Sequence, residues 1–349
     1  MMSEELSRRE RRVLEAVIRT YVETAEPAGS RMISRRFGLG VSPATIRNTM
    51  SDLEEKGFLY HPHTSAGRIP TNKAYRLYVD SLLSLPPVLA SENERLAGEI
   101  GAGGNISAIE TILRRAAQTL GILTQELGVA LGPRLERSVL RRLELVRVTT
   151  DRLLMVLTLD GAVVRTVFVE VAGEIADTAL AEVTVVLNER LVGLPLAEIR
   201  TSLAARLRDT RGDRSVSELL NIFVQEGELL FDAALPSAES QVLLGAASVL
   251  AEQPEFSEAD RMRRLLALTE TPTALADAIR NRPNAPGITI TIGAEHHDPR
   301  LEEFTVVTSE YQAGPLTGVI GVIGPTRMSY DKVISLVSHT SRLLSDLLD

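Results

Sequence analysis

Cysteine is absent from the 349-residue chain, and its absence removes several kinds of chemistry at once. Disulfide bonds, thiolate nucleophiles and cysteine-ligated zinc fingers are all excluded. The opening Met-Met-Ser-Glu-Glu also lacks the basic and apolar regions of a secretory signal. The longest weakly polar run, residues 313–325, is rich in glycine and proline and shorter than the roughly 20 residues that cross a membrane. We therefore expect a soluble, cytoplasmic protein.

Positive charge is outnumbered, since 38 Lys and Arg against 46 Asp and Glu give the whole chain a formal net charge of −8 at pH 7. By itself this balance argues against a nucleic-acid partner. The charge is uneven, however: residues 1–80 hold 13 Lys and Arg against 10 Asp and Glu, whereas the remainder holds 25 against 36. A mildly basic N-terminal region on an acidic body indicates a DNA-binding module attached to a part with another task. The length allows two or three domains.

A helix with well-marked ends is predicted just after Ser42. This serine is a favourable N-cap, Pro43 suits the first helical position, and Gly57 ends the helix. Its apolar positions follow the helical period and are Ile46, Met50 and Leu53. One side of this helix is therefore expected to pack on a core, while the other side is free for a partner.

The order of charges along this helix indicates what the partner is. Asp52, Glu54 and Glu55 all lie in the last half, whereas the first half contains Arg47 and no acidic residue. A helix selected for stability alone would place its acids near the positive N-terminal end of the helix dipole. A helix whose N-terminal half meets phosphates and base edges must keep carboxylates away from that end. The order favours a helix that faces DNA.

Two helices are predicted upstream, and a short hairpin follows. The first helix starts at the capping box formed by Ser7 and Glu10, and the second spans about 28–37. After the DNA-facing helix, residues 58–60 can pair with Arg68 and Ile69. Helix-turn-helix patterns also occur in helical proteins without a DNA partner. The cap, the charge order and the hairpin together favour a winged helix-turn-helix domain, to which we assign residues 1–83.

The residues expected to contact DNA form two groups. Base or groove contact is expected from Ser42, Pro43, Ala44, Thr45, Arg47 and Asn48. Phosphate or minor-groove contact is expected from Ser30, Arg31, His63, Thr64, Ser65 and Arg68. Arginine pairs well with guanine and asparagine with adenine in the major groove, so Arg47 and Asn48 are the best candidates for reading bases.

The body of the chain alternates between strands and helices. Strands are expected at 143–149, 153–159 and 163–171, with the hairpin signal Asp160-Gly161 between the last two. Helices are expected at 175–190, 196–209, 214–232, 257–269 and 272–281, with a strand at 241–250 within this block. Strands return at 287–293, 303–309 and 316–323, and a helix closes the chain at 328–348. This order predicts an α+β fold in which one antiparallel sheet is interrupted by an inserted block.

Two places could indicate an enzyme, and each has a simpler explanation. Gly318, Gly321 and Gly324 could cradle a phosphate, but they alternate with Val and Ile inside an apparent strand, which favours strand packing. His296-His297-Asp298 could be an acid-base or metal site, but a polar turn ending at Pro299 explains it better. His61 and His63 lack a third metal ligand. We expect no catalytic, cofactor or metal site.

Three motifs closely resemble one known family. They are Ser-Pro-Ala-Thr-Ile-Arg-Asn at 42–48, Pro-His-Thr-Ser-Ala-Gly-Arg-Ile-Pro-Thr at 62–71 and Gly-Pro-Thr-Arg-Met-Ser-Tyr at 324–330. The family is that of the HrcA heat-inducible transcription repressors. The resemblance runs over the full length, because motifs at both ends of the chain match in the same order.

The resemblance implies a dimeric repressor that binds an inverted-repeat operator, the CIRCE element, upstream of chaperone operons. It implies that the GroE chaperonin keeps the repressor in its DNA-binding form. It also implies a GAF-like domain in two segments, for which we expect 105–195 and 285–349, with an inserted dimerising domain at 196–284. A linker is expected at 84–104, where proline and glycine break the pattern.

Three questions stay open at this point. The leucine-rich helices of the inserted block fit an ordinary core as well as a self-complementary dimer face. The GAF-like domain could sense a small-molecule ligand. The chain could also be an enzyme with an accessory DNA-binding head.

Overall fold

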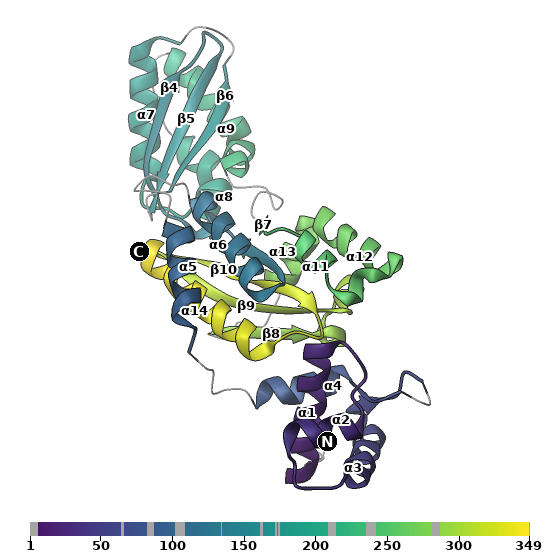
Figure 1. Cartoon of the computed structure of the whole chain (residues 1–349). Helices are drawn as coiled ribbons and strands as arrows, with labels where there is room; N and C mark the ends of the chain where they lie inside the picture. The colour runs from purple at the N-terminus through teal and green to yellow at the C-terminus, as the bar shows by residue number, and fades with distance from the viewer. Residues whose placement is uncertain are drawn as a thin grey trace. The chain divides into compact units, whose positions relative to one another are not determined.

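A computed structural model describes most of the chain and divides it into two compact units (Figure 1). The described residues are 6–63, 66–81, 87–101, 109–133, 135–160, 163–171, 173, 175–208, 214–234, 242–280 and 287–348. The first unit comprises Met1–Ala130, Leu243–Glu310 and Ile320–Arg342, and the second comprises Leu131–Val242, Tyr311–Val319 and Leu343–Asp349. Among the described residues, no helix is both long and apolar enough to span a membrane.

The N-terminal part of the first unit, which we call the head, is built from short elements with strong caps. Its elements are α1 (Arg8–Thr24), α2 (Ser30–Phe37), α3 (Pro43–Glu55), β1 (Leu59–Tyr60), β2 (Ile69–Pro70) and α4 (Asn72–Asp80). The predicted capping box is confirmed, because Ser7 Oγ accepts from Glu10 N and the Glu10 carboxylate accepts from Ser7 N. Thr71 caps α4 in the same manner, by accepting from Ala74 N.

The head closes around a small apolar core. Fully buried side chains come from α1, α2, α3 and α4 and include Val17, Ile33, Ile46, Leu53 and Tyr75. The predicted apolar positions of the DNA-facing helix, 46, 50 and 53, are all buried. Each buried aliphatic side chain stabilises the fold by about 1.5–3 kcal/mol relative to an exposed one.

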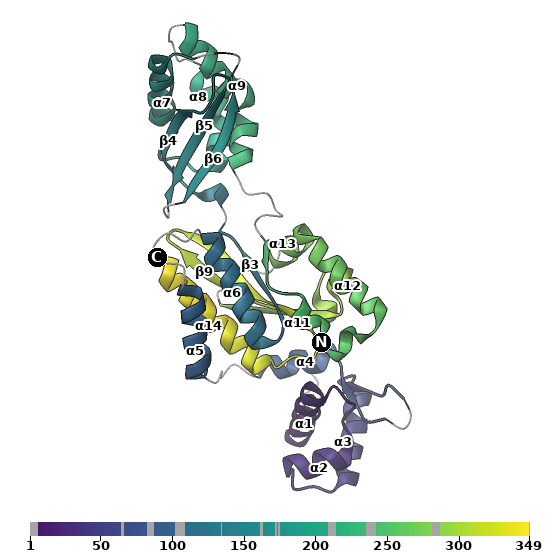
Figure 2. The ribbon, with the colours of Figure 1, turned by 45° about the horizontal axis from the view of Figure 1, so that its top comes forward.

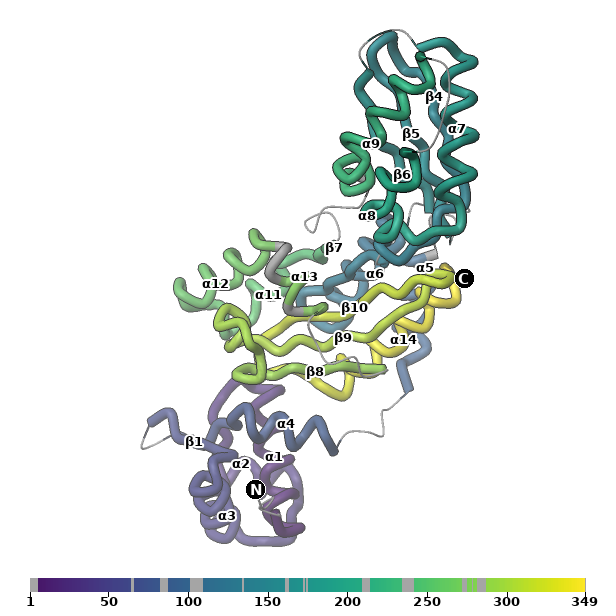
Figure 3. Tube along the Cα trace, turned by 180° about the vertical axis from the view of Figure 1, so that it is seen from behind, coloured from purple at the N-terminus to yellow at the C-terminus, as the bar shows by residue number. Residues whose placement is uncertain are grey.

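The rest of the first unit contains most of a five-stranded sheet in the order β7-β3-β10-β9-β8. Its strands are β7 (Val242–Leu244), β3 (Leu127–Leu131), β10 (Leu316–Pro325), β9 (Phe304–Ala313) and β8 (Ile288–Ile292). The helices α5 (Ala90–Gly101), α6 (Ile109–Thr124) and α14 (Tyr330–Leu348) lie on one face (Figures 1 and 3). The inserted helices α11 (Ser248–Ala251), α12 (Ala259–Glu270) and α13 (Pro272–Arg280) lie near the β7 edge.

The glycines of β10 are explained by strand packing, as predicted. A Cβ atom on Gly321 would lie 2.1 Å from the Val307 carbonyl oxygen on β9. The position therefore accepts no side chain while the two strands stay this close. These glycines belong to a packed strand and not to a phosphate-binding loop.

The second unit contains a three-stranded antiparallel sheet in the order β4-β5-β6 (Figure 2). Its elements are β4 (Leu140–Arg147), β5 (Arg152–Leu159), β6 (Val164–Glu170), α7 (Asp177–Leu191), α8 (Leu196–Leu207) and α9 (Arg214–Ala234). Burial alternates along the strands, and the helices pack on the face that carries Leu143, Leu153, Met155 and Val167. One face of the sheet is thus core, while the other carries exposed residues.

The prediction of one interrupted antiparallel sheet is wrong. Strands β4, β5 and β6 pair with one another, and none of them belongs to the five-stranded sheet. A period of two residues shows which face of a strand is buried, but it does not show which strands are partners. The second unit therefore begins near Leu131, before the strands that we had assigned to the split domain.

Three smaller details also differ from the sequence-based prediction. Strand β3, at 127–131, was not predicted, because its continuous burial lacks the alternation of a half-exposed strand. The predicted linker at 84–104 contains helix α5, in which Leu96 and Ile100 are buried. The expected strand within 241–250 is shorter and is followed by α11. By contrast, the helices predicted at 175–190, 196–209, 214–232, 257–269 and 272–281 are all present.

Candidate nucleic-acid interface

The start of α3 is fixed by a side-chain cap and a proline. Ser42 Oγ accepts a hydrogen bond from Thr45 N at 3.1 Å and lies 2.9 Å from Thr45 Oγ1. Pro43 occupies the first turn, where its missing N–H costs nothing. The first turn contains no acidic residue, so no carboxylate of this turn compensates the positive end of the helix dipole.

The exposed face of α3 brings the predicted base-reading residues together. Ser42, Pro43, Ala44, Arg47 and Asn48 are exposed, and Thr45 is half-buried. Ala44, Arg47 and Asn48 are spaced by three and four residues, so their side chains lie on one face of the helix. The opposite face carries the buried Ile46, Thr49, Met50 and Leu53. The sequence-based assignment of two faces agrees with the burial.

One of the three acidic residues in the second half of α3, Glu54, is engaged within the head. Glu54 Oε2 lies 2.6 Å from an Arg68 guanidinium nitrogen, and its Oε1 lies 3.2 Å from His61 Nδ1. At the C-terminus of α3, Lys56 Nζ lies 2.7 Å from Glu10 Oε1 on α1. The Lys56 ammonium and the Ser7 hydroxyl lower the pKa of Glu10 from 4.5 to about 2. This end of α3 is therefore held by ion pairs to the rest of the head.

The hairpin places Arg68 differently from the sequence-based expectation. Leu59 pairs with Pro70 and Tyr60 with Ile69. The backbone of Arg68 exchanges two hydrogen bonds with Ala28, at 2.9 and 3.0 Å, just before α2. Its side chain is 13% exposed and pairs with Glu54. Arg68 thus joins the hairpin to α2 and α3, and phosphate contact by its side chain stays a prediction.

The other predicted phosphate contacts are spread over two elements. Arg31 is exposed on α2 and Ser30 is half-buried at its start. His63 is exposed on the hairpin. Thr64 and Ser65 lie outside the described residues. Among the described residues, no three His, Asp or Glu side chains gather as metal ligands. His61 Nδ1 contacts Glu54.

A group of exposed arginines on α1 was missed in the sequence-based selection. Arg8, Arg9, Arg11 and Arg12 are exposed in the first turns of the helix, and within the described part of the chain they form no ion pair. Cations near a helix N-terminus oppose its dipole. The argument from charge order that singled out α3 could have identified them too.

The histidines near β9 form a turn, as expected. Asp298 caps the short 3₁₀ helix η5 (Pro299–Leu301) by accepting from Arg300 N at 2.9 Å, and it also pairs with the Arg300 guanidinium. This pairing lowers the pKa of Asp298 below its ordinary value. His296 Nε2 lies 3.2 Å from the Phe304 carbonyl oxygen.

Comparisons with known proteins agree with one another. A family model described as the HrcA protein C-terminal domain matches residues 110–334. The chain is 38% identical over 346 residues to the heat-inducible transcription repressor HrcA of Geobacter sulfurreducens, covering 99% of both chains. It is 37% identical over 355 residues to the repressor of the same name from Chlorobium phaeovibrioides, covering 99% of this chain and 98% of that one. A crystal structure of a hypothetical protein shares the fold with a TM-score of 0.62, at 24% identity and 99% coverage of both chains.

Proposed function

The chain belongs to the HrcA family of heat-inducible transcription repressors, and from this premise we propose that it binds an inverted-repeat operator of the CIRCE type as a dimer. In this proposal the head is a winged helix-turn-helix domain. Helix α3 enters the major groove, and the hairpin lies against the neighbouring backbone. The order of three helices followed by a two-stranded hairpin supports this assignment.

One observation carries the proposal: the N-terminal half of α3 is exposed, capped and free of acidic side chains. A duplex repels carboxylates and attracts the positive end of a helix. Arg47 and Asn48 are both exposed there and offer the donor patterns that read guanine and adenine. Ser42, Pro43, Ala44 and Thr45 line the same helix end and would contact the groove walls.

The positions around α3 would supply contacts to phosphate. The described members of this group are Ser30 and Arg31 on α2 and His63 and Arg68 on the hairpin, and Thr64 and Ser65 are proposed from sequence alone. The exposed arginines of α1 add positive charge to the head. Such contacts position a protein on the duplex without reading its sequence.

An exposed apolar face supports the proposed dimer. On the outer side of the three-stranded sheet, Val146 lies opposite Leu154, and Leu154 lies opposite Phe168. Phe168 is 61% exposed, and Val146 and Val164 are also exposed. Contiguous apolar surface of this kind is typical of an interaction site. We therefore propose that the dimerising part includes β4–β6 as well as the helices that follow, and that a two-fold dimer presents two heads to the two half-sites.

The proposal has two further parts. The five-stranded sheet and its flanking helices form a GAF-like domain, and the GroE chaperonin controls the repressor. Both rest on membership of the family. In this account the chaperonin is a protein partner that keeps the repressor able to bind its operator.

Selection of bound duplexes from a random pool, at a fixed stated salt concentration and with GroE chaperonin present, tests the proposal. We expect an enriched inverted repeat. Asp52→Ala, at an exposed position in the second half of α3, is the matched control for Asn48→Ala. The control should select the same repeat, whereas Asn48→Ala should lose one base preference in each half-site. Recovery of sequences without two-fold symmetry by the unaltered protein would refute operator reading by a dimer.

A further inference from the structure

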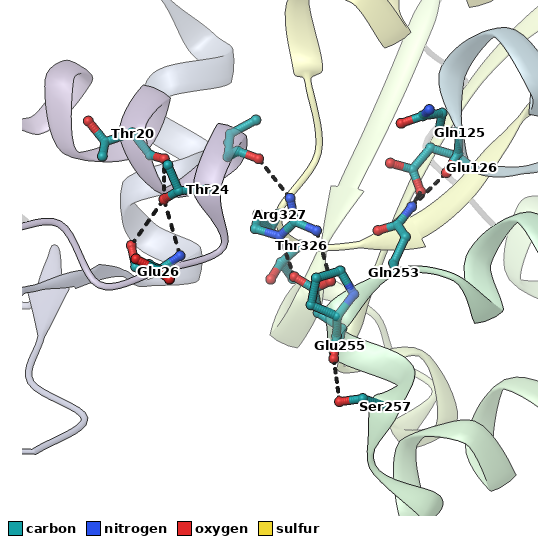
Figure 4. Close-up of polar contacts among 12 residues, drawn as sticks. Thr20, Thr24, Glu26, Gln125, Glu126, Gln253, Glu255, Ser257, Thr326 and Arg327 are labelled. Atoms are coloured by element: carbon teal, nitrogen blue, oxygen red, sulfur yellow. Dashed lines mark hydrogen bonds and ion pairs between the residues drawn. The ribbon is translucent and has the colours of Figure 1, made fainter. Parts of the chain in front are cut away.

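The third motif, Gly-Pro-Thr-Arg-Met-Ser-Tyr at 324–330, lies far along the chain from α3, at the end of β10 and the start of α14. Its arginine makes three contacts (Figure 4). Arg327 Nε donates to Glu255 Oε1, and Arg327 Nη2 donates to Glu255 Oε2 at 2.9 Å. Arg327 Nη1 donates to the carbonyl oxygen of Val22 on α1 at 2.7 Å. We call Arg327, Glu255 and the Val22 carbonyl the clamp.

The clamp supplies a positively charged hydrogen-bond donor to the C-terminus of α1, which has no basic residue in its own last turn. The last four carbonyl groups of a helix have no partner within the helix, and cations near that end are favourable. Helix α1 has no basic residue in its last turn and ends at Ala25 in the left-handed conformation, with φ of 56°. Arg327, from a position 305 residues later, donates to one of these carbonyls. The end of α1 is thus completed by the body of the unit.

The clamp is also well shielded from water. The side chains of Arg327 and Glu255 are 14% and 16% exposed. The Glu255 carboxylate raises the pKa of Arg327 above its ordinary value, so the guanidinium stays charged. Removing one partner of such a pair leaves the other charge without compensation. Neither residue can therefore be replaced without a consequence for the contact to α1.

Glu255 is in turn held by the five-stranded sheet. Glu255 lies on the 3₁₀ helix η3 (Pro254–Ser257), and this helix begins directly after Gln253. Gln253 Nε2 donates to the Gln125 carbonyl oxygen at 2.6 Å and to Glu126 Oε2 at 3.2 Å, just before β3 (Figure 4). Glu126 is buried against Gly324, where a Cβ atom would lie 1.9 Å from Glu126 Oε2. Gln253 is thus bonded to the residues just before β3, and Glu255, two residues later in the chain, is bonded to Arg327, which contacts α1.

A second set of contacts attaches α4 to the same body. Arg76 Nε donates to Glu295 Oε1 at 2.6 Å, and Arg76 Nη2 donates to the Ile290 carbonyl oxygen at 2.8 Å. The rings of Tyr75 and Tyr330, both fully buried, have centroids 5.7 Å apart. Tyr330 belongs to the same motif as Arg327. The head is therefore attached at two places, through α1 and through α4.

We propose that Arg327 is a positioning residue for operator reading, which, with Glu255, holds α1 and hence α3 in one orientation on the five-stranded sheet. This inference rests on the proposed function as regards DNA. Two heads held in fixed orientations by a dimer meet half-sites of one spacing, whereas heads released from the clamp tolerate several spacings. The motif at 324–330 thereby acts on DNA binding without touching DNA.

The absence of cysteine allows a direct test by paired spin labels. Labels are placed at Glu55→Cys on α3 and Glu302→Cys in the body, both exposed positions outside the clamp, in full-length chain diluted with unlabelled chain. We expect one narrow distance distribution in the parent. Arg327→Lys, which cannot hold the carboxylate through two nitrogens and reach Val22, and Glu255→Gln should each broaden it.

Matched controls are Arg264→Lys and Glu303→Gln, which alter an exposed ion pair of 2.8 Å in the body. Both should leave the distribution narrow. A narrow distribution in Arg327→Lys and Glu255→Gln alike would overturn the positioning role. If circular dichroism shows that Arg327→Lys has lost helix content, Glu255→Gln alone decides, because it keeps the arginine.

Operators with altered half-site spacing give the second readout. The parent should prefer one spacing by about tenfold, a discrimination equal to that of one mismatched base pair, and the clamp variants should lose most of this preference. Variants that keep the preference would count against the proposal. A parent that binds no inverted repeat would refute the proposed function, while the distance measurement would still decide whether Arg327 positions the head.

Discussion

The two halves of the candidate interface differ in how their arginines are used. Arg47, on the exposed face of α3, projects from the protein, whereas Arg68, on the hairpin, is largely buried and paired with Glu54. Both arginines lie within sequence motifs that resemble the same family, and the sequence predicts DNA contact for both. The difference is made by residues distant in sequence, since Glu54 and Ala28 hold Arg68 in place. Residue type and motif thus indicate a candidate interface, but the contacts that each side chain makes within the fold decide which side chains remain available.

Replacing Arg68 gives the largest expected difference between the two arginines. Arg68→Ala should lower the free energy of unfolding by about 2 kcal/mol, because hydrogen bonds to charged groups contribute roughly 1.5–3 kcal/mol. Chemical denaturation of the full chain measures this effect. Arg31→Ala, at an exposed arginine of α2, is the control and should change stability by less than about 0.5 kcal/mol. Equal stabilities of the two variants would contradict a structural role for the Arg68 side chain.

Replacing Arg47 should produce the opposite pattern. Arg47→Ala is expected to weaken operator binding by roughly 1–3 kcal/mol through loss of a base contact. Its stability should match that of the parent, since the side chain is exposed. Parallel titrations of operator and unfolding curves test both statements. A large loss of stability would mean that Arg47, like Arg68, is structural.

The ion pair between Glu10 on α1 and Lys56 at the end of α3 should make the stability of the fold depend on pH. The folded pKa of Glu10, about 2, lies below its ordinary value of 4.5, so its ionised form stabilises the fold above pH 4.5. This contribution is lost as the pH falls toward 2. Glu10→Gln should therefore cost about 1–2 kcal/mol at neutral pH. Unfolding measurements across this range should show the parent and the variant converging at low pH; a constant difference would contradict the ion pair with Lys56.

Replacement of an exposed arginine of α1 should give the smallest change in DNA affinity. Arg12→Ala is expected to weaken binding to operator and to random DNA equally, and to reduce the salt dependence by about one counterion. Affinities measured over a series of salt concentrations test this. A selective loss on operator would instead assign Arg12 to base reading and would extend the reading surface beyond α3.

Much of the head could be predicted because its signals are local. Caps at Ser7 and Ser42 and the helical spacing of Ile46, Met50 and Leu53 lie within one element each, and the structure confirms them. Pairing between distant segments could not be predicted in this way. The separate sheet of β4–β6, the buried strand β3 and the link from Arg327 to Val22 all depend on contacts between distant parts of the chain. A single sequence carries no periodic signal for such contacts.

The most direct test of operator reading is the specificity ratio of Asn48→Ala. Affinities for the selected inverted repeat and for a randomised duplex of equal length are measured at one salt concentration for parent and variant. We predict that the ratio falls by about tenfold, which corresponds to one lost base contact, while the affinity for random DNA stays unchanged. Equal losses on both duplexes would contradict base reading by the exposed face of α3.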